Sequence, residues 1–88
     1  MPYIKAEHRP EIDEEVKPLA EMLGADVGKL NYAITTLLIE TIKIQGGPNY
    51  GRINALMGTL SCVKAEFYRR MAAPYEDKKI EENGDVFS

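Results

Sequence analysis

The sequence has little of the chemistry from which most catalytic sites are built. It contains one cysteine, one histidine and no tryptophan in 88 residues. A single cysteine cannot form a disulfide within the chain, which fits a reducing compartment, so we expect the cytoplasm. No apolar run approaches the roughly 18 residues that span a bilayer. The opening MPYIKAEHRP also lacks the hydrophobic region of a signal peptide. We therefore expect neither a membrane span nor a leader.

Positive charge is also in short supply. Eleven lysines and arginines face 14 acidic residues, for a net charge of −3. A nucleic-acid binder needs a basic face, so nucleic acid is not an expected partner. One candidate anion-binding patch consists of three arginines and two tyrosines: Arg52, Arg69, Arg70, Tyr50 and Tyr68. Acidic residues lie among them, and Glu66 is four residues before Arg70, so local salt bridges are the favoured interpretation.

Residues 10–24 have helical spacing of their apolar positions. Pro10 suits the first turn of a helix, where its missing N–H has no intrahelical partner in any case. Pro18 conflicts with the pattern, because inside a helix it removes a hydrogen bond. We expect either a kink there or a second helix starting near Lys17. Gly24 is a typical C-terminal stop.

Residues 30–44 carry the strongest helical pattern, and Asp26 is a candidate N-cap. The apolar arc of this segment is wider than the stripe of a one-sided surface helix, so we expect contacts from two directions. Gly46 and Gly47 end it. Residues 48–73 then form a long helix, capped by Asn49 and closed by Pro74. The short connector predicts an antiparallel helical hairpin.

The long helix has two different apolar faces. Seven large residues share one side, here called the large face: Ile53, Leu56, Met57, Leu60, Val63, Phe67 and Met71. Five small residues share the opposite side, here called the small face: Gly51, Ala55, Gly58, Cys62 and Ala65. A glycine in a helix interior costs roughly 1 kcal/mol relative to alanine, so Gly58 needs a reason. Close approach of another helix supplies one; contact with a bulky residue of the same chain, such as Tyr32 or Tyr75, is the alternative.

Residues 74–88 are highly charged and contain the pair Asn83-Gly84. Asn-Gly is the strongest short-range signal for a hairpin turn, although its flanks alternate poorly. We expect a tail that docks through Ile80, Val86 and Phe87, or else a short hairpin or a frayed end.

These patterns predict one all-α domain over residues 1–88, with an N-terminal arm (1–9), a helical body (10–73) and a C-terminal tail (74–88). The body has about three helices, with the first packed across the hairpin of the other two. The large face forms the core of the subunit. The small face mediates a homodimer or a tetramer.

Enzymatic interpretations are weaker. All-α nucleotide pyrophosphohydrolases hold magnesium on Glu-x-x-Glu and Glu-x-x-Asp pairs. Glu82 with Asp85 has the second spacing, and Glu11 with Glu14 or Glu15 loosely has the first, but Asn83-Gly84 interrupts the helix that would align Glu82 with Asp85. A run of carboxylates is more often a solvated face.

Two single residues invite other enzymatic hypotheses. Pro2 could be a general base if Met1 is removed, as in the tautomerases, but those enzymes need a β-α-β unit that the sequence does not predict. Cys62 is interpreted as a small buried apolar residue, because no basic partner accompanies it. We assign no catalytic residue, metal ligand or cofactor.

Three segments carry a resemblance: MPYIKAEHRP, LNYAITTLLIE and YGRINALMGTLSCVKAEFYRRMAAPYEDKKIEENGDV. They resemble a family of short proteins of unknown function found in prokaryotes and their tailed phages. The resemblance implies a self-contained unit whose charged end belongs to the family pattern, and it implies no activity or cofactor. We therefore expect a non-enzymatic, oligomeric interaction module, with a further protein partner possible.

Overall fold

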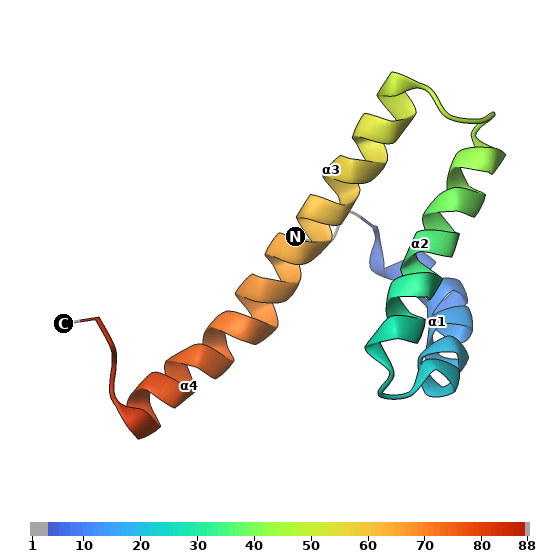
Figure 1. The fold of residues 1–88 in the computed structure, drawn as a ribbon. Coiled ribbons are helices and arrows are strands. Elements are labelled where there is room, and N and C mark those ends of the chain that lie inside the picture. The colour runs from blue at the N-terminus through green and yellow to red at the C-terminus, as the bar shows by residue number, and fades with distance from the viewer. Residues whose placement is uncertain (1–3, 88) are drawn as a thin grey trace. The chain divides into compact units, whose positions relative to one another are not determined.

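The computed structural model describes residues 4–87, which are all-α and contain three helices and no strand. The chain divides into two compact units, Met1–Gly47 and Pro48–Ser88. The first unit holds α1 (Arg9–Leu23) and α2 (Val27–Ile44). The second holds one continuous helix (Figure 1). The all-α prediction is therefore confirmed, while the antiparallel hairpin stays a prediction.

The first helix agrees with the expectation at Pro10 and departs from it at Pro18. A short 3₁₀ turn, Ala6–His8, precedes α1, so the predicted arm is partly helical. Pro10 lies in the first turn of α1, as predicted. Pro18 lies inside the helix, which continues to Leu23, so the second helix predicted near Lys17 is absent from the described residues.

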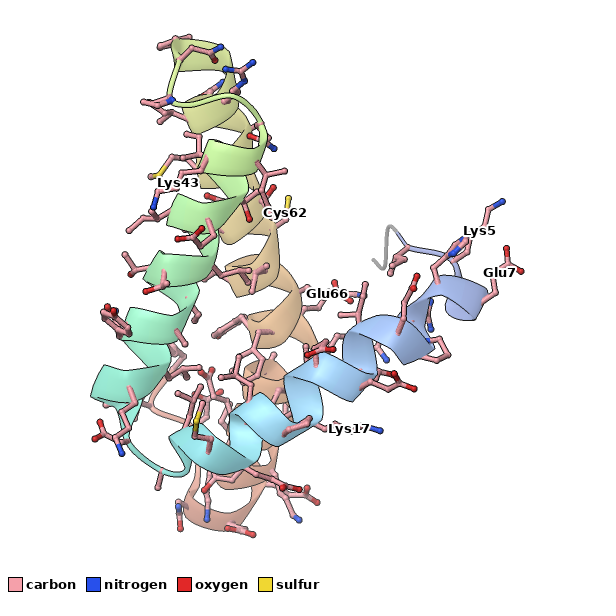
Figure 2. The ribbon with its side chains drawn as sticks, turned by 90° about the vertical axis from the view of Figure 1, so that its right-hand side faces the viewer. Lys5, Glu7, Lys17, Lys43, Cys62 and Glu66 are labelled. Carbon is pink, nitrogen blue, oxygen red and sulfur yellow. The ribbon has the colours of Figure 1, made fainter. Side chains whose placement is uncertain are left out.

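Glycines and one aspartate define the ends of the elements around α2. The N–H of Gly24, whose φ is +61°, donates to the Ala20 carbonyl at 3.0 Å and ends α1. The Asp26 carboxylate then accepts from the N–H groups of Gly28 (2.9 Å) and Lys29 (3.2 Å), so the predicted N-cap is confirmed. From this turn, α1 and α2 leave in different directions (Figure 2). Gly46, at φ +110°, lies just beyond α2.

The second unit is a single helix in three parts. Asn49 caps α3 (Tyr50–Phe67) by accepting from the Arg52 N–H at 2.8 Å. One π-helical turn, Tyr68–Ala72, joins α3 to α4 (Ala73–Asn83). The helix therefore continues past Pro74, and the predicted stop there is wrong. The short-hairpin alternative for the C-terminal end is also wrong, because residues 79–82 are helical and Gly84 (φ +85°) ends the helix.

The π turn explains how the helix passes Pro74. Proline has no N–H and its ring collides with the carbonyl four residues earlier in a regular α-helix. In the wider turn, the Ala73 N–H donates to the Tyr68 carbonyl, five residues back. Pro74 then falls in the first turn of α4, where its missing N–H costs little.

No residue among 4–87 is fully buried. In the second unit the reason is geometric, because one helix cannot cover its own side chains. Met57 is 59% exposed and Phe67 is 63% exposed. The large face is therefore not a core within its own unit. Its apolar side chains need a surface supplied from outside that helix.

Candidate association surface

The small face lies entirely on α3. Its five members, Gly51, Ala55, Gly58, Cys62 and Ala65, are all exposed. They follow one another at intervals of four, three, four and three residues, which average 3.5. This spacing keeps a stripe in line with a partner helix that coils around the first. The face is therefore one straight, shallow strip along α3.

Gly58 is open on its outer side within its own unit. No side chain of residues 48–87 lies within 4 Å of the position that a Cβ on Gly58 would take. Within this unit, contact with Tyr75 is therefore not the reason for the glycine. Gly58 does not need glycine's backbone freedom either, since it is not among the glycines with positive φ.

Cys62 differs from the prediction of a buried residue. It is a free cysteine and is exposed on α3 (Figure 2). An exposed small apolar residue in the middle of the small face is consistent with an uncovered contact surface. It also offers a thiol at a known position for cross-linking.

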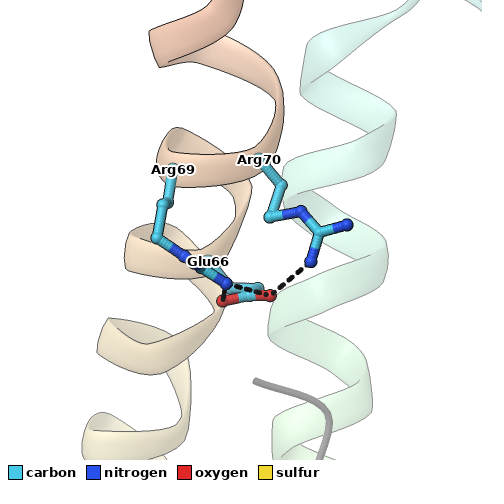
Figure 3. A network of polar contacts seen from close by, with 3 residues as sticks. All are labelled: Glu66, Arg69 and Arg70. Atoms are coloured by element: carbon cyan, nitrogen blue, oxygen red, sulfur yellow. Dashed lines mark hydrogen bonds and ion pairs between the residues drawn. The ribbon is translucent and has the colours of Figure 1, made fainter.

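The basic residues beyond the small face are engaged locally. Glu66 accepts from Arg69 at 3.4 Å and pairs with Arg70 at 3.9 Å (Figure 3). The predicted Glu66–Arg70 pair is thus confirmed. Each side chain of this cluster is exposed or half-exposed, so each pair contributes at most about 1 kcal/mol. The arrangement favours a structural ion cluster over an anion-binding patch.

A second polar contact crosses the π turn and was not predicted. The Tyr68 hydroxyl donates to the Glu76 carboxylate at 3.0 Å, over a separation of eight residues. That hydrogen bond, and then the negative charge of Glu76, hold the pKa of Tyr68 above its ordinary value. This contact could not be predicted from local patterns, because the pairing requires a helix that continues through Pro74.

The carboxylates do not form a magnesium site in the part of the chain that is described. Among residues 4–87 there is no group of three or more His, Cys, Asp or Glu side chains that could hold a metal ion. Glu82 lies in the last turn of α4 and pairs with Lys79 at 3.1 Å. Asp85 lies beyond Gly84 and accepts from the Phe87 N–H at 2.9 Å. The helix break predicted between Glu82 and Asp85 is confirmed.

The remaining candidates give no catalytic arrangement. Pro2 lies outside the described residues, and the β-α-β unit that a tautomerase needs has no strand in residues 4–87. None of the helices within those residues is long and apolar enough to cross a bilayer.

Fold and surface together define a small all-α protein. The chain belongs to the family described as a domain of unknown function (DUF6899), whose model matches residues 1–86. No curated protein and no solved structure matches the chain. The predicted resemblance to a family of unknown function is confirmed at this level.

Proposed function

We propose that this protein is a non-enzymatic helical module that works as a homo-oligomer, either a dimer or a tetramer. The observation that carries the proposal is the continuous helix from Tyr50 to Asn83, which has apolar faces on opposite sides. A single surface can cover only one of these sides. The large face is the expected core of the subunit, and the small face is left for a second copy.

The size of the chain supports the same proposal. A domain of 88 residues buries a comparatively small fraction of its unfolded surface, and its stability is correspondingly modest. Association of folded copies adds stability by mass action. The wide apolar arc of α2, in which Leu30 is 47% and Leu37 is 65% exposed, offers further area for a tetramer or for a different protein partner.

We place this module in the cytoplasm. The support is its single cysteine, together with the occurrence in prokaryotes and their tailed phages that the resemblance implies. In such cells the cytosol keeps a thiol such as that of Cys62 reduced.

The test is the native mass measured by light scattering across a dilution series. We expect a dimer or tetramer for the natural sequence and a smaller species for Gly58→Leu, because the leucine side chain holds the helices apart. Met57→Leu, one position earlier on the large face of the same helix, nearly conserves side-chain volume, so it is a matched control and keeps the assembly. A monomer at every concentration would contradict the proposal.

A further inference from the structure

The charges that flank the small face are arranged asymmetrically along α3. Arg52 and Glu66 each directly follow a member of the small face, namely Gly51 and Ala65. They therefore lie on the same flank of the strip, two heptads apart, with the uncharged Thr59 midway. On the opposite flank the corresponding heptad positions are the uncharged Asn54 and Ser61, and the nearest charge on that side, Lys64, lies further round the helix from the small face.

This arrangement distinguishes the two ways in which two copies can pair. In a parallel pair, each flank faces the opposite flank of the other helix, so Arg52 meets uncharged residues. In an antiparallel pair, each flank faces the same flank in reverse order, so Arg52 of one copy faces Glu66 of the other. By symmetry this pairing forms twice, at the two ends of the contact.

The small face itself fits the antiparallel register. Its positions are nearly symmetric about Gly58: Gly51 and Ala65 lie seven residues to either side, and Ala55 and Cys62 lie three and four residues away. A two-fold axis at Gly58 therefore brings the two glycines together. It also places Gly51 opposite Ala65, and Ala55 within one residue of Cys62, so that small residues meet small residues along the strip. Arg52 then lies within two residues of Glu66 of the other copy, which is about 3 Å along the helix axis and within reach of these long side chains.

From this charge complementarity and symmetry we infer that the small face binds a second copy of this chain in antiparallel register, centred on Gly58 and closed at each end by Arg52 against Glu66. The inference rests on the proposed homo-oligomer and adds its direction and register. Arg69 and Arg70 hold the Glu66 carboxylate in position on its own helix. Arg52 of the second copy thus approaches an acceptor that is already ordered.

The antiparallel register predicts how far apart the two Cys62 residues lie in the dimer. The two Cys62 residues would lie eight residues apart along the helix axis, which is about 12 Å at 1.5 Å per residue. A disulfide needs Cα atoms within about 7 Å of each other. The natural protein would therefore not cross-link through Cys62, whereas a cysteine at position 55 would lie within one residue of Cys62 of the other copy.

The experiment oxidises the full chain mildly and follows disulfide-linked dimers. We expect Ala55→Cys to cross-link at least tenfold faster than the natural protein, with residues 55 and 62 found joined by peptide mapping. Met57→Cys, whose new thiol lies on the large face of the same helix, is the matched control and does not cross-link. Rapid cross-linking of the natural protein would show parallel pairing and would overturn the inference.

A second measurement tests the proposed ion pair between Arg52 of one copy and Glu66 of the other. We expect Arg52→Glu to raise the dissociation constant of the dimer roughly three- to tenfold, because two favourable ion pairs become repulsive, while Arg52→Lys changes it little. An unchanged constant in Arg52→Glu would overturn the register. If light scattering shows a dimer but Ala55→Cys does not cross-link, the register is overturned and the proposed homo-oligomer still holds. If light scattering shows a monomer, both the register and the homo-oligomer are overturned.

Discussion

At the scale of single residues, the helix caps make a quantitative prediction. Asn49 satisfies an N–H group in the first turn of α3, and its replacement by alanine leaves that group without its acceptor. We expect Asn49→Ala to lower the free energy of unfolding by about 1 kcal/mol. Urea denaturation followed by circular dichroism, at fixed protein concentration, measures it. Asn54→Ala, in the interior of α3, is the control and should be neutral or stabilising, because alanine is the better helix former there.

Tyr68 offers a prediction that depends on pH. The hydrogen bond from its hydroxyl to Glu76, and then the charge of Glu76, favour the neutral phenol and raise the pKa of Tyr68. The contribution to stability is therefore fully present below the ordinary tyrosine pKa of about 10 and is lost as the pH rises through the raised value. Ultraviolet titration should show one phenol that ionises above the ordinary tyrosine range.

The assignment of that tyrosine follows from two variants. Tyr68→Phe should remove the late step from the titration, and Glu76→Gln should move it back toward the ordinary pKa. Because the pair is exposed, added salt should shrink the shift. A late step that persists in Tyr68→Phe would assign it to another tyrosine and contradict the contact.

At the scale of elements, the two prolines of α1 should respond oppositely to the same substitution. Pro18 lies inside α1, where alanine would restore a hydrogen bond to the Glu14 carbonyl, so Pro18→Ala should stabilise the helix by up to about 3 kcal/mol. Pro10 lies in the first turn, where no such bond is lost, so Pro10→Ala should change stability little. Thermal unfolding of both variants measures the difference, and equal shifts would contradict this account.

The same elements show how far sequence patterns reach. Capping by Asp26 and Asn49 and the stop at Gly24 could be predicted, because each depends on one residue and its immediate neighbours. The stop at Pro74 could not be judged this way. In a single π turn the backbone N–H donates to the carbonyl five residues earlier instead of four, and no local sequence pattern predicts that change.

The C-terminal end illustrates an ambiguity of a different kind. Asn-Gly supports a hairpin turn because glycine readily adopts positive φ. A helix C-terminus uses the same property, and Gly84, at φ +85°, ends α4. The two structures share one signal, so the flanking residues must decide. Here Lys79 and Glu82 pair at a helical spacing of three, and the helix prevails.

At the scale of the whole molecule, the candidate association surface was predictable as a pattern of small residues, while its occupant was not. The five residues lie on one helix face in any α-helical arrangement, so spacing alone places them together. Which surface covers them depends on a partner, and the chain by itself cannot supply that information. The proposed antiparallel register uses the flanking charges to narrow the possible partner surfaces to a second copy of this chain.

The last prediction uses Gly58 to separate the stability of the helix from that of the assembly. Gly58→Leu should strengthen the isolated helix by roughly 0.5–1 kcal/mol, because leucine is a far better helix former than glycine. The same change should remove the close contact between copies. At low protein concentration the variant should therefore unfold at a higher temperature than the natural protein.

At high concentration the order should reverse, because only the natural protein gains stability from association. Thermal unfolding over a hundredfold range of concentration would show a rising midpoint for the natural chain and a constant midpoint for Gly58→Leu, with the two curves crossing. Parallel curves, or a natural midpoint that does not move with concentration, would mean that Gly58 acts only within its own chain. The crossing is specific to a glycine that costs helix stability and is retained for contact between molecules.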